Sequence, residues 1–252
     1  EVSEKEIEAL IKQIKTDKIT AKLLLQRKMK NKEDILHFFK PDLSNLHDPF
    51  LMKDMNLAVN RIIKACKQKE KVMLYGDYDV DGTTAVSLLF NNLNEHLNLT
   101  YYIPDRFKEG YGISKTGIDY AISKNIKLII SLDCGIKSKN EIAYAKKNKI
   151  DFIVCDHHEV GDDIPTCIVL NPKQKDCNYP FDGLSGCGVG FKLLEGIYKE
   201  LRWDKKLLYS HLELVAISIA ADMVPITNEN RILAFHGLSK LNSNPIRALK
   251  EM

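Results

Sequence analysis

The chain has 252 residues, of which 44% are hydrophobic and 28% are charged. This composition supports a sizeable core and excludes wholesale disorder. The formal net charge of +3 is too small to identify a partner from bulk electrostatics. No apolar run approaches the roughly 20 residues that cross a bilayer, and no signal peptide precedes the fold, so we expect no membrane association. The 6 cysteines form no close CxxC pair, which favours reduced thiols in a cytosolic protein.

The first part of the chain is predicted to be helical. Residues 3–40 have the pattern of short, lysine-rich amphipathic helices that end near a Lys-Pro step. A linker rich in Pro, Ser, Asn and Asp follows, and residues 51–69 again show helical periodicity. We therefore expect a small helical N-terminal subdomain over residues 1–70.

From residue 71 onward, short apolar runs alternate with stretches of helical periodicity. Strands that are apolar throughout and separated by helices indicate a parallel sheet covered on both faces. We therefore expect an α/β domain over residues 71–252, with a mostly parallel sheet, helices on both faces and the strand carboxyl ends at one edge. The predicted strands are 72–75, 99–103, 128–132, 152–155 and 167–170. The predicted helices are 82–97, 114–124, 138–148, 188–201 and 207–221.

Three predicted strands run directly into acidic residues or imidazoles. Because ligand sites in such sheets gather at the carboxyl edge, we expect these side chains to converge. Carboxylates this close together repel one another unless a cation holds them, and oxygen and imidazole ligands suit Mg²⁺ or Mn²⁺. More than four such ligands indicates two ions, the arrangement that serves phosphoryl chemistry. The side chains are Asp77, Asp79, Asp81, Asp133, Asp156, His157 and His158.

These segments resemble the motifs of the DHH phosphoesterase superfamily and, within it, the RecJ family. The matching segments run in the expected order from about residue 46 to the chain end: 46–50, 75–84, 103–112, 131–136, 156–158, 184–189 and 221–225. The resemblance implies a metal-dependent 5′→3′ exonuclease that hydrolyses single-stranded DNA to mononucleotides in recombination and repair. It also implies a monomer in the bacterial cytoplasm, with helicase or single-strand-binding protein partners. RecJ proteins continue into a DHH-associated domain and an oligonucleotide-binding domain, so we interpret the chain as a fragment.

The resemblance also assigns roles to individual residues. The implied ligands of two Mn²⁺ or Mg²⁺ ions, with Asp133 as the bridge, are Asp79, Asp81, Asp133, His157 and Asp222. Asp77 is a further ligand or a neighbouring acceptor, because Tyr75 stands where some members of the superfamily carry a histidine.

The remaining implied roles concern substrate and leaving group. Asp156 orients an imidazole, and His158 stabilises charge at the scissile phosphate or assists the leaving oxygen. Arg106 and Lys108 hold a phosphate of the strand. The glycine-rich segment 185–190 forms a phosphate cradle or permits close packing of the following helix.

Two alternatives fit the same pattern less well. A DHH phosphodiesterase acting on short RNA or cyclic dinucleotides, or a manganese pyrophosphatase, typically has a histidine in its first motif, where this chain has Tyr75. A noncatalytic replication factor that kept the fold would have lost ligands, whereas every acid and both imidazoles are retained here.

Overall fold

The computed structural model describes residues 2–252 and divides the chain into two units between Leu46 and His47. The first unit contains three short helices, α1 (Glu4–Ile14), α2 (Lys18–Gln26) and α3 (Lys32–Phe39). Each begins at a polar residue whose side chain accepts a backbone N–H, as helix N-termini require. Their apolar faces bury a small core: Ile7, Leu10, Ala21, Leu24, Leu25 and Ile35.

The second unit begins earlier than the expected boundary near residue 70. It opens with the 3-10 turn η2 (Pro49–Leu51) and helix α4 (Met55–Lys67), while η1 (Leu43–Asn45) precedes the division. Helix α4 packs against α8 and β5, and its Met55 and Val59 lie against Gly196 of α8. Because this apolar face is buried against the sheet domain, α4 belongs to that unit.

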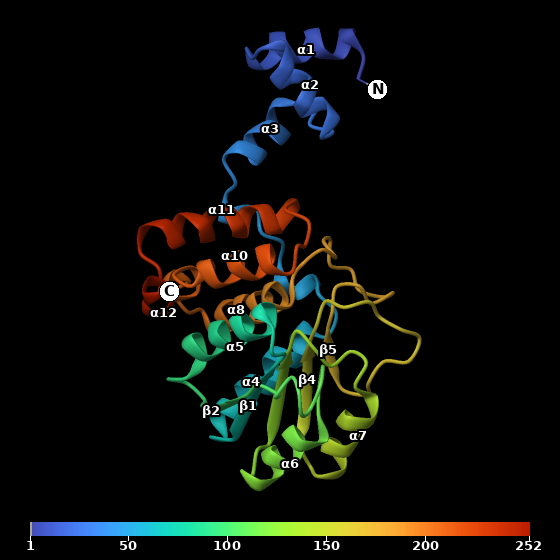
Figure 1. The fold of residues 1–252 in the computed structure, drawn as a ribbon, viewed down its shortest axis with the longest axis vertical. Helices are drawn as coiled ribbons and strands as arrows, with labels where there is room; N and C mark the ends of the chain where they lie inside the picture. Colours follow the sequence, from blue (N-terminus) through green and yellow to red (C-terminus); the bar gives the residue numbers. More distant parts are fainter. Residues whose placement is uncertain (1) are drawn as a thin grey trace. The chain divides into compact units, whose positions relative to one another are not determined.

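A five-stranded parallel sheet forms the centre of the second unit, as the sequence predicts (Figure 1). Its order is β2-β1-β3-β4-β5, and all four pairings are parallel. Apart from the exposed first residues of β1 and β4, the central strands are buried and mainly apolar, because helices cover both of their faces. The strands are β1 (Lys71–Gly76), β2 (Asn98–Tyr102), β3 (Leu128–Leu132), β4 (Asp151–Cys155) and β5 (Ile168–Leu170).

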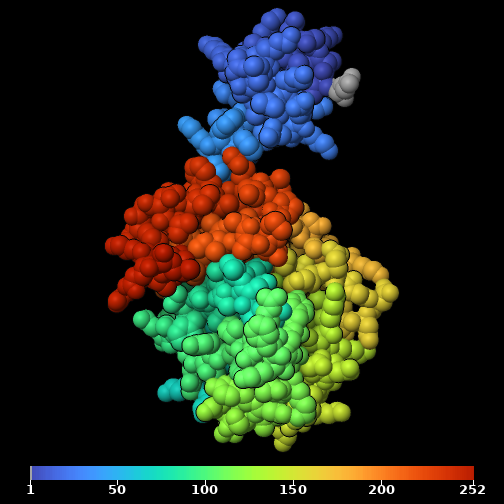
Figure 2. Space-filling view, viewed as in Figure 1, coloured from blue at the N-terminus to red at the C-terminus, as the bar shows by residue number. Residues whose placement is uncertain are grey.

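Helices cover the two faces of the sheet unequally. On one face lie α6 (Lys115–Ser123) and α7 (Lys139–Lys147), packed on a core that includes Met73 and Ile129. On the other lie α5 (Val80–Leu93) and α8 (Gly186–Leu201), which contact the strands and each other. The segment between β5 and α8, gold in Figure 2, runs at the surface of this unit.

A further helical layer packs outside α5 and α8. Helix α10 (Leu212–Ala221) contacts both, and α11 (Asn228–Ser243) packs on α10 (Figure 1). The single helix predicted over 207–221 is interrupted, because α9 (Lys206–Tyr209) ends before α10 begins. Helix α11 was not predicted, and the short helix α12 (Arg247–Glu251) follows it. Among the described residues, no helix combines the length and apolar character needed to cross a bilayer.

A buried ion network joins the start of the second unit to α8 and α11. The Lys192 ammonium is fully buried and donates to the His47 carbonyl at 2.7 Å and to Glu229 at 3.1 Å. It also donates to Glu195, while Tyr179 donates to the second oxygen of Glu229. Removing one member of such a network leaves a buried charge without its counterion.

Replacing Lys192 with methionine should therefore lower the free energy of unfolding by about 3–5 kcal/mol. The matched control is Lys199→Met on the same helix, which removes a half-exposed ion pair with Asp48 and should cost less than about 1 kcal/mol. Urea unfolding followed through the fluorescence of Trp203, the only tryptophan, measures both. Equal losses in the two variants would contradict the role assigned to Lys192.

Candidate metal centre

Acids and imidazoles from distant parts of the chain converge at the carboxyl edge of the sheet. They follow β1, β3 and β4 and the end of α10, and their ligand atoms form three overlapping groups, each within 4.8 Å. The predicted metal ligands are thus brought together. We call the following seven residues the acid cluster: Asp77, Asp79, Asp81, Asp133, His157, His158 and Asp222.

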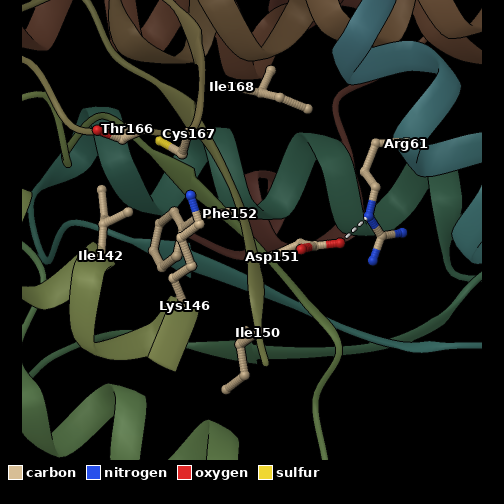
Figure 3. A pocket seen from close by; sticks show the side chains of 9 residues that line it. All are labelled: Arg61, Ile142, Lys146, Ile150, Asp151, Phe152, Thr166, Cys167 and Ile168. Atoms are coloured by element: carbon tan, nitrogen blue, oxygen red, sulfur yellow. Dashed lines mark hydrogen bonds and ion pairs between the residues drawn. The ribbon is translucent and has the colours of Figure 1, made fainter. Parts of the chain in front are cut away.

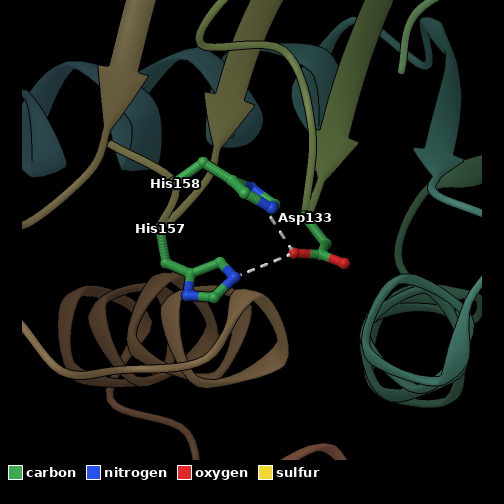
Figure 4. Close-up of side chains that lie close together, drawn as sticks. All are labelled: Asp133, His157 and His158. Carbon is green, nitrogen blue, oxygen red and sulfur yellow. Dashed lines mark ion pairs between the residues drawn. The ribbon is translucent and has the colours of Figure 1, made fainter. Parts of the chain in front are cut away.

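His157 lies at the centre of the acid cluster. Its Nε2 atom is 3.2 Å from Asp133 Oδ1, 3.6 Å from Asp222 Oδ2 and 3.7 Å from Asp81 Oδ2. Figure 4 shows His157 and His158 turning toward Asp133 from the segment that follows one strand of the sheet. One imidazole therefore faces carboxylates from three separate elements.

Asp133 occupies a strained and buried position. It follows β3 with a positive φ of 62°, a conformation that costs energy for a residue other than glycine. Its carboxylate is buried, and this burial, together with the charges of Asp81 and Asp79, raises the pKa of Asp133 to about 10. A nearby cation would favour the ionised form that this environment disfavours.

The acid cluster contains polar atoms that have no hydrogen-bond partner within the described residues. Asp133 Oδ1, His157 Nε2 and Asp77 Oδ1 are all buried and make no hydrogen bond of good geometry. Buried polar atoms are rarely left in this state, and divalent cations bound by the candidate groups would satisfy them. The oxygen and imidazole donor set therefore fits Mn²⁺ or Mg²⁺.

Asp81 is held by the N-terminus of α8. Its two oxygens accept the N–H groups of Gly186 and Cys187, each at 2.7 Å. Two amides of segment 185–190 therefore bind a carboxylate of the acid cluster. Burial nevertheless raises the pKa of Asp81. The helix N-terminus favours the ionised form of this carboxylate against that burial.

Sequence reasoning missed a hydroxyl pair behind Asp81. Ser218 of α10 is fully buried, and its Oγ lies 2.7 Å from Asp81 Oδ1 and 2.6 Å from Ser185 Oγ. Ser185 caps α8 by accepting the Gly188 N–H. The available signal in the sequence was a serine within a mainly apolar helix, three residues before the end of α10.

Gly186 allows α8 to approach Asp133. A Cβ atom at this position would lie 2.5 Å from Asp133 Cβ and Oδ1, closer than packed atoms approach. Gly135 serves a different need, because its φ of 118° is a conformation that other residues rarely adopt. Both glycines therefore shape the site through the backbone.

Asp156 organises the two histidines rather than joining the acid cluster. Its Oδ1 accepts the N–H groups of His157 and His158 and, at 2.7 Å, the Nδ1 of His158, while Oδ2 accepts the Ile136 N–H. Burial opposes ionisation, but these bonds outweigh it and lower the pKa of Asp156. The same contact raises the pKa of His158. Asp156 thus orients the half-exposed His158 imidazole.

The segment at the end of β1 and directly after it, residues 75–79, contributes in three different ways. Asp77 is buried, which raises its pKa, and it groups with Asp79 and Asp133. Asp79 is exposed and caps α5 by accepting the Gly82 N–H at 2.9 Å. Tyr75 packs in the core between the sheet and helices α6 and α7, and its hydroxyl donates to the Gly112 carbonyl at 3.1 Å. Tyr75 therefore does not take the place of a histidine ligand.

The two predicted phosphate-binding residues lie outside the acid cluster, on the loop between β2 and α6. The Arg106 guanidinium lies 5.3 Å from the centre of the Tyr78 ring, and Tyr78 stands between Asp77 and Asp79. Lys108 is exposed, with its ammonium 3.7 Å from Asp105. Arg106 is thus adjacent to the acid cluster, whereas Lys108 lies near Asp105 of its own loop.

A pocket of about 290 Å³ lies elsewhere, near the beginning of β4 (Figure 3). Its lining is mainly apolar and includes Phe152 and Ile168. Its Arg61 guanidinium already pairs with Asp151 at 2.6 Å and with Glu70 at 2.7 Å. The residues that line this pocket are therefore separate from the acid cluster.

The fold and the acid cluster define an α/β domain with an acidic site at the carboxyl edge of a parallel sheet. Residues 71–219 match the model of the DHH family, N-terminal domain. The chain belongs to the DHH family. This result confirms the resemblance seen in the sequence.

Similar proteins are single-stranded-DNA-specific exonucleases named RecJ. That of Bacillus subtilis is 38% identical over 98% of this chain and 31% of its own length. That of Escherichia coli is 35% identical over 75% of this chain and 35% of its own length. The chain thus spans about a third of the length of these relatives.

Solved structures of exonuclease RecJ share the fold. One bound to manganese superimposes with a TM-score of 0.74 at 26% identity, covering 83% of this chain and 52% of its own. The Thermus thermophilus RecJ in complex with Mn²⁺ gives a TM-score of 0.83 at 22% identity, covering 99% of this chain and 35% of its own. The expected fold class is therefore confirmed.

Gly186→Ala should destabilise the second unit by about 1–3 kcal/mol, because the new methyl group overlaps Asp133. The control is Gly161→Ala, where a Cβ meets nothing within 4 Å. Urea unfolding of both variants tests the prediction. A Gly186→Ala protein as stable as the control would show that α8 tolerates a larger separation from Asp133.

Proposed function

We propose that the protein is a metal-dependent 5′→3′ exonuclease that hydrolyses single-stranded DNA to mononucleotides, in DNA recombination and repair. The observation that carries this proposal is the approach of Asp133 Oδ1 to His157 Nε2 at 3.2 Å, with both atoms buried and without a hydrogen bond. The similarity to RecJ exonucleases supports the choice of substrate. We place this activity in the bacterial cytoplasm.

The proposed cofactors are two Mn²⁺ or Mg²⁺ ions. Similar RecJ structures contain manganese or magnesium, which supports this choice. Asp133 belongs to two of the three candidate groups, as expected of a carboxylate shared between ions. The proposed ligands are Asp77, Asp79, Asp81, Asp133, His157 and Asp222.

When bound, the cations neutralise the phosphodiester and acidify an attacking water. The chain itself supplies orientation and proton transfer. Asp156 holds Nδ1 of His158 at 2.7 Å and favours its protonated form. His158 is half-exposed at the mouth of the acid cluster, so its imidazole is positioned to stabilise charge on the phosphate or to protonate the leaving sugar oxygen.

Arg106 and Lys108 are the proposed contacts to phosphates of the strand. Arg106 lies over Tyr78, which stands between Asp77 and Asp79, and this position supports a contact between its guanidinium and a phosphate of the strand. A guanidinium suits this task because its fixed fork of donors matches phosphate oxygens. Exposed Lys108 would serve as a second, less directional charge.

The protein at its natural full length should degrade 5′-labelled single-stranded oligonucleotides, but not duplexes, in the presence of Mn²⁺. Asp133→Asn should lower the rate by at least about 100-fold, because it removes a ligand shared by both proposed ions. Gel electrophoresis of the labelled products gives the rate and the product length.

The control for this assay is Asp119→Asn, an exposed carboxylate paired with Lys115 on α6, which should leave the rate unchanged. Equal cleavage of duplex would reject the proposed substrate. A near-normal rate in a folded Asp133→Asn protein would remove Asp133 from the proposed metal site.

Ser218→Ala should weaken Mn²⁺ binding by about 10- to 100-fold, because the partners of metal ligands tune affinity to this extent. Ser218 holds Asp81 without facing a proposed ion itself. Ser210→Ala, which removes an exposed hydroxyl bonded to the Leu207 carbonyl, is the control. Calorimetric titration with Mn²⁺ measures both. An unchanged dissociation constant for Ser218→Ala would restrict Ser218 to a structural role.

A further inference from the structure

The loop between β2 and α6 displays an almost fully exposed aromatic ring. Phe107 is 95% exposed, and Tyr111 on the same loop is 56% exposed. Single apolar residues at a surface are common, but these two lie on a loop that reaches the acid cluster. The Tyr111 hydroxyl lies 3.1 Å from His158 Nε2.

Hydrogen bonds brace this loop internally. The Asp105 carboxylate accepts the N–H groups of Phe107 and Lys108 at 2.9 and 3.1 Å. Glu109 in turn accepts the Asp105 N–H at 2.9 Å and the hydroxyl of Tyr102, a residue of β2. The turn that carries Phe107 is therefore fixed by its neighbours, while its ring is left in water.

The base of the loop is tied to the sheet and to α6. Ser114, the cap of α6, donates its hydroxyl to Glu109 and its N–H to the Tyr75 hydroxyl. Tyr75 lies in β1, so its hydroxyl anchors the loop to a central strand. Tyr75, which stands where some family members carry a histidine, therefore holds the loop in place.

Charge and shape around Phe107 match a single nucleic-acid strand. Arg106 and Lys108 are the chain neighbours of Phe107, so the loop that carries this exposed apolar ring also carries cations that could bind phosphates. Phe107 is four residues from Tyr111, so their backbones are at most about 14 Å apart. A strand bound at the acid cluster could therefore extend to Phe107. Val80 and Met223, which are chain neighbours of proposed ligands, are also exposed apolar residues.

We propose that Phe107 is a base-stacking residue that binds a nucleotide of the single strand near the cleavage site. The inference rests on the proposed function and deepens it, because it assigns a contact to the base rather than to the phosphate. Stacking on an aromatic ring requires no particular base, which suits an exonuclease that must accept every nucleotide. A base paired in a duplex does not offer its face to such a ring.

The test uses the protein at its natural full length with Mn²⁺ and oligonucleotides whose phosphorothioate linkages resist cleavage. A 2-aminopurine near the 5′ end reports stacking through quenching of its fluorescence. Phe107→Ala should raise the Kd for the single strand about ten-fold and reduce the quenching, whereas Phe107→Trp should retain both. With a cleavable strand, KM should rise while kcat changes little.

Phe235→Ala on α11, another exposed phenylalanine, is the matched control and should leave the Kd unchanged. An unchanged Kd for Phe107→Ala, or a lowered Tm without a change in Kd, would overturn the proposal by showing that the ring binds no base. An equal effect of Phe235→Ala would also overturn it. Wild-type cleavage of the single strand in the same experiment separates this outcome from failure of the proposed exonuclease activity.

Discussion

The second unit is organised around the free energy needed to hold several carboxylates together out of water. Two like charges 4 Å apart repel by on the order of 4 kcal/mol in surroundings with an effective dielectric constant near 20. Asp77, Asp81 and Asp133 are all buried at one edge of the sheet, and burial raises the pKa of each. Only an opposing positive charge makes such a group of ionised acids stable, which is the physical basis for proposing cations there.

The protein supplies part of that positive charge itself. The N-terminus of α8 points two amides at Asp81, and the Asp156–His158 pair places a partly exposed imidazole beside Asp133. The His158 Nδ1 atom lies 4.0 Å from Asp133 Oδ1, one of the atoms that lack a hydrogen-bond partner. The result is a site whose backbone is fixed by hydrogen bonds and whose unpaired atoms face one another.

The surroundings of the acid cluster differ from its centre. Acids gather where cations are proposed, whereas exposed aromatic and basic side chains, among them Phe107 and Arg106, lie on the adjacent braced loop. This separation suits a polyanionic substrate such as a DNA strand, because the acids would repel its phosphates until bound cations neutralise them. Substrate affinity and metal binding are thus assigned to different elements of one sheet edge.

The sequence by itself determined the parallel sheet and the strands that end in acids or imidazoles, because apolar runs and the residues that follow them are local properties, and the family resemblance added Asp222. Tertiary structure alone decided that Tyr75 anchors a loop, that α8 amides bind Asp81 and that Ser218 supports this contact. It also placed α4 with the sheet domain and added α11 to the outer layer. These features depend on packing between segments far apart in the chain, which no local pattern records.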